Sequence, residues 1–170
     1  TYFPEFQNWK PKDGEEEVTI RIEHLMTHTS GLPPYAPTQD LMRQYGSPNP
    51  MGLLQHICNV QRDFEPSTDF QYSCLNFITL QHIIEKVSGQ SLRDFARENI
   101  FDVLGMDYTD YLPCAPDKKG NWKNTAEAHW ASLMPTGQDW RTLVAPTTKE
   151  GKDSVLIGQV HDPLAHFMNG

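Results

Sequence analysis

Apolar residues recur at helical spacing in several separate stretches of the chain, and turn-forming residues mark the ends of these stretches. The longest stretch covers residues 75–87, with apolar residues at positions 77, 80, 83, 84 and 87 on one face, which Leu75 and Ile78 widen. Thr79, His82, Glu85 and Lys86 fall on the opposite face. We therefore expect a helix that buries the first set, capped by Ser73 and ended by Gly89.

Shorter stretches show the same period upstream and downstream of this helix. In residues 22–26 the apolar side chains Ile22, Leu25 and Met26 share one face. Asn49 followed by Pro50 is a typical helix start, and Ser91 with Asp94 resembles a capping box. We expect further helices over residues 38–45, 50–60 and 92–100.

The helical period fades after residue 107. Residues 124–133, "NTAEAHWASL", fit one more helix. The stretches 142–146 and 154–160 have a β-branched, alternating character with Gly151 between them, which predicts a small β-hairpin. The pattern indicates a mainly α fold with one hairpin and no run of βαβ units.

Composition and charge exclude several classes of function. The 170-residue chain has a net charge of −8 and no block of Lys or Arg, which argues against nucleic-acid binding. It contains no run of 18 apolar residues, so we expect no membrane span within it. The three cysteines, Cys58, Cys74 and Cys114, show no metal-binding spacing and do not decide the compartment.

The stretch "DFQYSCLNF" places Tyr72 at the predicted start of the long helix, where a phenol can carry protons. Free tyrosine has a pKa near 10, so it is a poor base at neutral pH. The positive end of the helix and a neighbouring lysine are two influences that would lower this pKa. Taken on its own, the spacing fits a structural tyrosine as well.

Two other chemistries have partial motifs in the sequence. The nearest approach to a GxSxG nucleophile elbow is "GQSLR", which lacks the last glycine, so Ser91 is read as a helix cap. His24 and His28 lie four residues apart and would share a helix face, as zinc ligands do. There is no HExxH, and no metal or other cofactor is expected. A third zinc ligand beside His24 and His28 would have to be His56, His82, His129, His161 or Asp162.

Several segments in order resemble the serine β-lactamase-related family, which includes class C β-lactamases, D-alanyl-D-alanine carboxypeptidases and related esterases. They are "IEHLMTHTSGLP", "FEPSTDFQYSCLNFITLQHIIEKVSGQSLRDFARENIFDVLGM", "LVAPTT" and "GQVHDPLAHFMNG", about two thirds of the chain. The resemblance implies an acyl-serine mechanism on a β-lactam, a peptidoglycan peptide or an ester. It also implies a periplasmic or secreted protein.

The family uses three motifs, and only the middle one, Tyr-x-Asn, has a counterpart here. It carries over to Tyr72 as the proton-transfer residue and to Cys74 as a substrate-binding position. Cys74 stands where the family usually has Asn, and Ser67 stands where it often has Gly. The sequence has no Ser-x-x-Lys, no Lys-Thr-Gly and no late His-x-Gly.

The resemblance therefore implies that residues 1–170 form one partial domain, the helical subdomain of the β-lactamase/transpeptidase-like fold. Its expected partners are the remainder of the parent domain and a small-molecule or peptidoglycan-peptide substrate. The chain alone is expected to be inactive, since the nucleophile should lie elsewhere in the parent protein. Two alternatives stay open: a non-catalytic helical module that binds cell-wall fragments or a protein, and a zinc hydrolase using His24 and His28.

Overall fold

The chain folds into a mostly helical structure with two short antiparallel strand pairs. A computed structural model describes residues 2–11, 16–46, 49–111, 114–116, 122–124, 131–132, 134, 137–148, 155–157 and 160–167. The α-helices in these ranges are α1 (Ile22–Met26), α2 (Thr38–Tyr45), α3 (Pro50–Asn59), α4 (Cys74–Ser88), α5 (Leu92–Ala96) and α7 (Pro163–Phe167). The strands are β1 (Cys114–Pro116), β2 (Trp122–Asn124), β3 (Pro146–Thr148) and β4 (Val155–Ile157). A π-helical turn, Arg97–Phe101, continues α5, and a 3-10 turn spans Trp140–Thr142.

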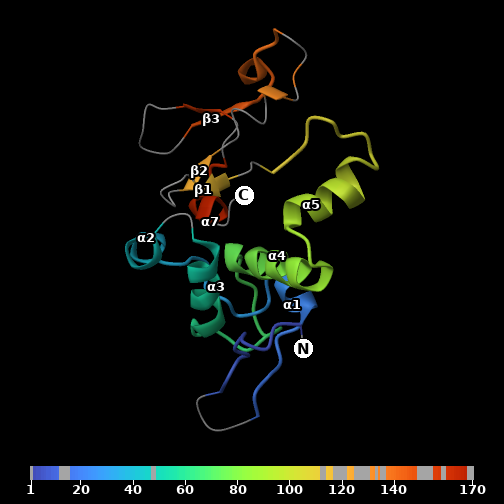
Figure 1. The fold of residues 1–170 in the computed structure, drawn as a ribbon. Coiled ribbons are helices and arrows are strands. Elements are labelled where there is room, and N and C mark those ends of the chain that lie inside the picture. The colour runs from blue at the N-terminus through green and yellow to red at the C-terminus, as the bar shows by residue number, and fades with distance from the viewer. Residues whose placement is uncertain are drawn as a thin grey trace.

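Helix α4 lies at the centre of the helical part and contacts α1, α3 and α5 (Figure 1). Figure 1 shows α1, α3 and α4 gathered at one end of the molecule and the strands at the other. The core between the helices is built from aliphatic side chains, each of which stabilises the fold by about 1.5–3 kcal/mol when fully buried. Its members are Leu25, Leu32, Ala36, Leu41, Leu53, Leu54, Ile57, Leu75, Ile78 and Leu164. Because Leu164 belongs to α7, the C-terminal segment is packed onto the helices.

Three predicted helix starts are confirmed by their capping hydrogen bonds. Asn49 accepts from the Gly52 amide at 2.9 Å before α3, and Ser73 accepts from the Leu75 amide at 3.2 Å before α4. The hydroxyl of Ser91 accepts from the Asp94 amide at 3.1 Å before α5. The end of α4 at Gly89 is confirmed as well, with a φ of 72° that glycine adopts without strain.

The predicted buried face of α4 is confirmed in part. Leu75 and Ile78 are buried, and Leu80 and Ile83 pack partly buried against the core. The prediction is wrong for Phe77 and Val87, which are exposed. The buried residues are Leu75, Asn76, Ile78 and Thr79, whereas Phe77 is 56% exposed. Thr79 is buried because its hydroxyl donates to the carbonyl of Leu75 at 2.7 Å, so no hydrogen-bonding group is lost. The predicted face of α1 is wrong in the same way: only Leu25 is buried, while Ile22 and Met26 are exposed.

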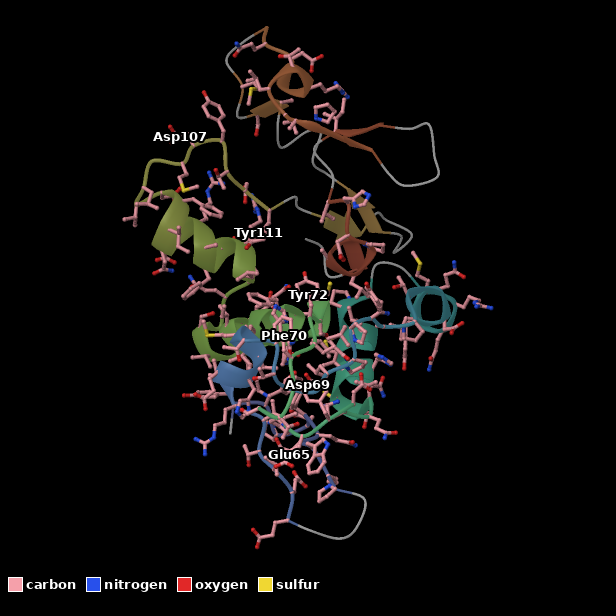
Figure 2. All side chains as sticks on the ribbon, turned by 180° about the vertical axis from the view of Figure 1, so that it is seen from behind. Glu65, Asp69, Phe70, Tyr72, Asp107 and Tyr111 are labelled. Atoms are coloured by element: carbon pink, nitrogen blue, oxygen red, sulfur yellow. The ribbon has the colours of Figure 1, made fainter. Side chains whose placement is uncertain are left out.

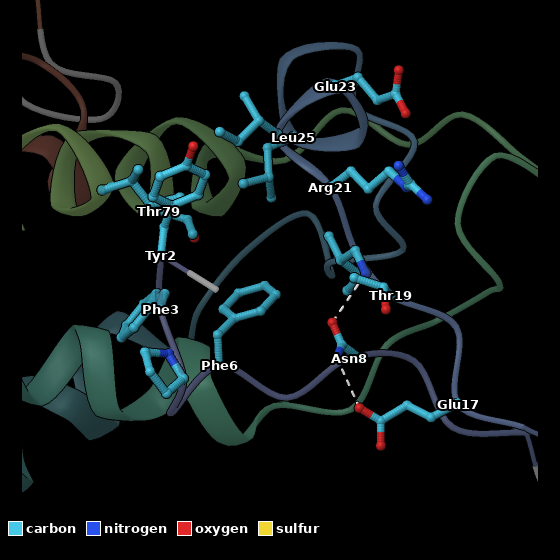
Figure 3. Close-up of a pocket in the computed structure, with 14 residues that line it drawn as sticks. Tyr2, Phe3, Phe6, Asn8, Glu17, Thr19, Arg21, Glu23, Leu25 and Thr79 are labelled. Atoms are coloured by element: carbon cyan, nitrogen blue, oxygen red, sulfur yellow. Dashed lines mark hydrogen bonds between the residues drawn. The ribbon is translucent and has the colours of Figure 1, made fainter. Parts of the chain in front are cut away.

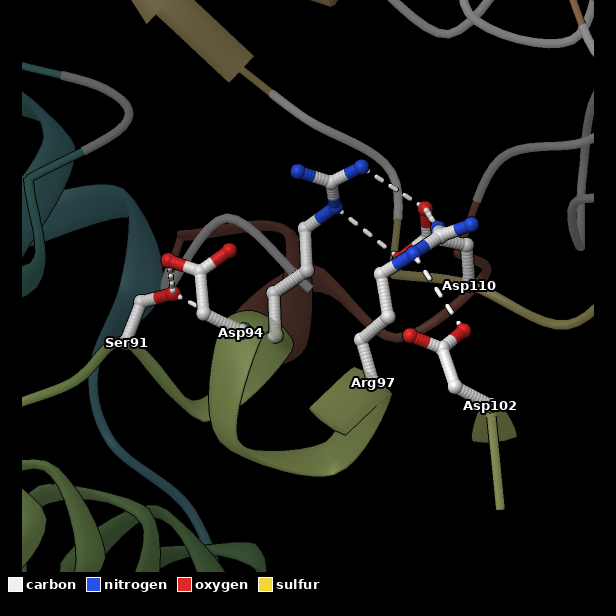
Figure 4. Close-up of polar contacts among 6 residues, drawn as sticks. Ser91, Asp94, Arg97, Asp102 and Asp110 are labelled. Carbon is white, nitrogen blue, oxygen red and sulfur yellow. Dashed lines mark hydrogen bonds and ion pairs between the residues drawn. The ribbon is translucent and has the colours of Figure 1, made fainter. Parts of the chain in front are cut away.

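The segment after the π-helical turn is tied back to α5 by a buried carboxylate. Asp110, whose side chain is fully buried, accepts from Arg93 at 2.9 and 2.7 Å and from Arg97 at 2.8 Å (Figure 4). Arg97 also lies 3.7 Å from Asp102, which is exposed. Asp110 therefore fixes the position of the chain that leads to the strands.

The strands differ in detail from the sequence pattern. Strand β3 pairs antiparallel with β4, and Pro146 lies opposite Ile157. Strand β3 therefore begins at Pro146, the residue at which the predicted strand over residues 142–146 ended. Strand β1 pairs with β2, which was not predicted. Asn124 lies in β2, so the helix expected over residues 124–133 does not begin there; residues 125–130 lie outside the described residues. No helix in the described ranges has the length and apolar character needed to cross a bilayer.

Candidate active site

Tyr72 lies directly before the capping residue of α4, and its side chain is 61% exposed. Figure 2 shows its ring at the start of this helix, with Phe70 nearby on the same segment. The structure thus places the phenol on an open surface and not in the apolar core. The two following residues, Ser73 and Cys74, begin the first turn of α4.

The imidazole of His28 packs beside Tyr72, with their ring centroids 4.7 Å apart. Phe77 and Phe70 lie on other sides of the same imidazole, at 5.4 and 6.2 Å. Nδ1 of His28 accepts from the Ser73 amide at 3.3 Å, which leaves the proton of the neutral ring on Nε2. His28 therefore links the ring of Tyr72 to the first turn of α4.

The hypothesis that His24 and His28 bind zinc from one helix face is wrong. Helix α1 ends at Met26, and His28 follows it with a φ of 57°, so His24 and His28 share no helix face. Nδ1 of His24 accepts from the amide of Arg21 at 3.1 Å. Within the described ranges, no three His, Cys, Asp or Glu side chains lie together as metal ligands would.

The segment "HTSG" is held against α4 by a buried polar network. The hydroxyl of Ser30 donates to the amide oxygen of Asn76 at 2.5 Å, and both side chains are fully buried. The amide nitrogen of Asn76 lies 3.0 Å from Nδ1 of His28. The carbonyl of Thr29 accepts from the Ser67 amide at 2.9 Å. This segment therefore satisfies backbone and side-chain hydrogen-bonding groups near a helix end.

Cys74 lies between Tyr72 and a carboxylate from the far end of the chain. Its Sγ is 4.0 Å from the Tyr72 hydroxyl and 3.7 Å from Oδ2 of Asp162. From the sequence, Asp162 is a candidate metal ligand or a residue that ties down the loop after the hairpin, and no pattern places it beside Cys74. The signal for its local role is an Asp directly before a Pro-led helix, but nothing in the sequence shows that this helix packs beside α4.

The pKa of Tyr72 is raised, and neither a lysine nor the end of the helix is among the groups that shift it in the described part of the chain. Cys74 raises the pKa of Tyr72 most, through its charged form and its hydrogen bond with the phenol, and burial and Asp162 raise it further. Burial and Asp162 also raise the pKa of Cys74. No cation is among the groups that shift either pKa in the described part of the chain. Tyr72 is therefore protonated at neutral pH in this chain and needs a cation from elsewhere to act as a base.

A separate pocket of about 880 Å³ opens between the N-terminal segment, α1 and α4 (Figure 3). Tyr2, Phe3 and Phe6 form part of its wall, and Thr79 and Ile83 come from α4. None of the candidate site residues, Tyr72, Cys74 or Asp162, lines it. The pocket contains no group that would act on the Tyr72 hydroxyl, so it is distinct from the site described above.

Comparison with known proteins places these residues in a familiar context. A family model described as Beta-lactamase matches residues 1–155. A protein of Escherichia coli K12 named as a D-alanyl-D-alanine carboxypeptidase is 25% identical over 99% of this chain and 37% of its own length. Penicillin-binding protein 4* of Bacillus subtilis is 33% identical over 64% of this chain and 24% of its own length. The matched parts thus span 37% and 24% of the length of these two relatives.

The fold is similar to that of a solved enzyme. The crystal structure of a D-stereospecific amidohydrolase from Streptomyces sp. aligns with a TM-score of 0.51 at 19% identity. The alignment covers 74% of this chain and 43% of the other. At this identity the similarity concerns the fold alone.

Proposed function

Because this chain belongs to the beta-lactamase family, we propose that the protein of which it forms part is a serine hydrolase that works through an acyl-serine intermediate. The observation that carries the proposal is the position of Tyr72. Tyr72 is exposed at the start of α4, with its ring beside that of His28 and its hydroxyl 4.0 Å from Sγ of Cys74. In this proposal Tyr72 is the proton-transfer residue and Cys74 lines the substrate site.

In the proposed reaction Tyr72 first accepts a proton and then donates it. The serine oxygen attacks the carbonyl carbon of the substrate, and its proton passes to the phenolate oxygen of Tyr72. The phenol then donates this proton to the leaving nitrogen or oxygen as the acyl bond breaks. Water attacks the acyl-serine in the second half, and its proton returns to the serine oxygen by way of Tyr72.

The raised pKa of Tyr72 sets a requirement on the rest of the protein. A phenolate at neutral pH needs a nearby cation, and the groups that act on Tyr72 here are Cys74, Asp162 and Tyr35. We assign this cation to the lysine of a Ser-x-x-Lys motif in the parent protein, since the present sequence has no such motif. The same motif supplies the nucleophile, so we expect the chain alone to be inactive.

Residues 1–170 are proposed to form one partial domain whose active-site cleft is completed by the remainder of the parent. Phe70, Tyr72 and Phe77 are each more than half exposed around His28, and such an aromatic surface usually has a partner. The proposed substrates are a β-lactam, a peptidoglycan peptide or an ester. The proposed location is the periplasm or the exterior of the cell.

A non-catalytic helical module that binds cell-wall fragments is the second candidate. Cys74 favours it, because a thiol is a weak hydrogen-bond donor and acceptor at a position that would contact substrate. Covalent labelling separates the two candidates. The full-length protein encoded by the gene is incubated with fluorescent penicillin and p-nitrophenyl acetate, in parallel with the present chain.

The enzyme proposal expects a covalent penicillin adduct, or ester turnover with an acyl adduct seen by mass spectrometry, on a serine outside residues 1–170. It expects no adduct on the present chain. An adduct on this chain would contradict its proposed inactivity. A full-length protein inert to both reagents would contradict the enzyme and favour the binding module.

A further inference from the structure

Asp162 uses its two carboxylate oxygens in different directions. Oδ1 accepts from the amides of Leu164 and Ala165 at 2.7 and 2.8 Å and so caps α7. Oδ2 faces the thiol of Cys74 at 3.7 Å. Since Leu164 in the same helix is only 4% exposed and belongs to the core, the carboxylate is held in place beside α4.

The partner of Oδ2 satisfies it only weakly. A thiol donates a poor hydrogen bond, whereas a carboxylate accepts strong ones from charged donors. In the part of the chain that the structure describes, the side-chain contact of Oδ2 is with this thiol. The carboxylate of Asp162 therefore faces the surface that also carries the Tyr72 hydroxyl with a weak donor as its partner.

We infer that Asp162 is a specificity-determining residue of this site and that it selects acyl donors with a free amino group next to the scissile carbonyl. This inference rests on the proposed function. An ammonium group carries three donors and a positive charge, so it pairs with Oδ2 where a thiol does not. In an aminoacyl group the amine and the carbonyl sit on adjacent carbons, so an ammonium at Asp162 holds the carbonyl on the side of Tyr72. A substrate carboxylate at the same place is repelled.

The side chain at position 74 belongs to the same inference. Cys74 is short, and its thiol offers Oδ2 of Asp162 only a weak donor, at 3.7 Å. An amide at this position would donate to Oδ2 and occupy it. Cys74→Asn is therefore expected to weaken the preference for an ammonium substrate without removing the carboxylate.

The test compares a matched pair of substrates on the full-length protein: D-alanine p-nitroanilide and its N-acetyl derivative. They differ in the charged amine and its acetyl cap. Asp162→Asn is the decisive variant, because asparagine caps a helix as well as aspartate does but carries no charge. Asp102→Asn removes the same charge at an exposed position next to the π-helical turn and serves as the control.

We expect the wild-type protein and Asp102→Asn to hydrolyse the free-amine substrate with a kcat/KM at least about tenfold above that of the N-acetyl substrate. In Asp162→Asn this ratio falls to about one, mainly through a higher KM for the free amine, and in Cys74→Asn it falls partway. Thermal unfolding that matches wild type shows that the α7 cap is kept. An unchanged ratio in Asp162→Asn, or a wild-type preference for the N-acetyl substrate, overturns the inference.

The results that test the proposed function can be distinguished from those that test the role of Asp162. Tyr72→Phe is expected to lower hydrolysis of both substrates alike, whatever Asp162 does. If both substrates are hydrolysed but Tyr72→Phe has no effect, the role of Tyr72 fails and the ratio in Asp162→Asn still decides the role of Asp162. If the wild type hydrolyses neither, both the substrate class and the inference are overturned, while penicillin labelling still tests the enzyme proposal.

Discussion

Ser30 and Asn76 share a 2.5 Å hydrogen bond between two fully buried side chains, and it joins the loop after α1 to the central helix. Through the amide nitrogen of Asn76 the same network reaches His28, whose ring lies against Tyr72. The polar residues that hold the fold together at this point therefore also position the proposed proton carrier.

We expect Ser30→Ala to lower the free energy of unfolding by about 1–3 kcal/mol, because the amide oxygen of Asn76 then lacks its donor in a buried place. Urea unfolding of the chain followed by circular dichroism measures this. Thr27→Ala removes an exposed hydroxyl that bonds to the Glu23 carbonyl, and it is expected to cost less than about 0.5 kcal/mol. Equal losses in the two variants would mean that burial of the network is unimportant.

Ser67 has a φ of 71°, a backbone conformation that strains every residue except glycine. Replacing it by glycine removes strain of about 1–2 kcal/mol and adds a smaller entropic cost in the unfolded chain. We predict that Ser67→Gly stabilises the chain by about 0.5 kcal/mol or more in the same unfolding measurement. Thr68→Gly, one residue on, is expected to destabilise it, and stabilisation by both glycines would refute the explanation.

Asp110 and Asp102 both pair with Arg97, but only Asp110 is buried. Removing the charge in Asp110→Asn leaves two guanidinium groups without their carboxylate, and we expect a loss of about 3 kcal/mol in the free energy of unfolding. The exposed pair loses at most about 1 kcal/mol in Asp102→Asn. Similar small losses for both variants would show that the buried pair does not hold the segment.

Burial lowers the pKa of both His56 and His82 below the ordinary value for histidine. The unfolded chain then binds protons more readily than the folded one as the pH falls through about 6.5. The free energy of unfolding is expected to decrease between about pH 7.5 and pH 5. His56→Gln combined with His82→Gln should flatten this dependence, and the exposed His161→Gln should not. An unaltered slope in the double variant would contradict the assignment.

Capping side chains in the sequence predicted where several helices of the fold begin. Capping side chains at Asn49, Ser73 and Ser91 fixed the helix starts, since each bonds to amides within three residues. The polar members of the buried face of α4 were not predictable from hydropathy. Asn76 and Thr79 are buried because their partners exist in the fold, and for Asn76 that partner lies 46 residues away.

Only those residues of the candidate site that lie close together in the sequence could be predicted. Tyr72 and Cys74 follow from a motif of three consecutive residues, whereas Asp162 reaches them across 88 residues. No periodicity or composition reports such a distant contact. The direction of the pKa shift of Tyr72 was not predictable for the same reason, because it depends on Cys74 and Asp162 being neighbours.

The acylation rate of Tyr72→Phe in the full-length protein tests the central claim most directly. The variant removes only the phenol hydroxyl, and the contact of its ring with His28 can be retained. Stopped-flow labelling with fluorescent penicillin is predicted to slow by about a hundredfold to ten-thousandfold at neutral pH, with thermal stability matching the wild type. An acylation rate equal to that of the wild type would contradict the account.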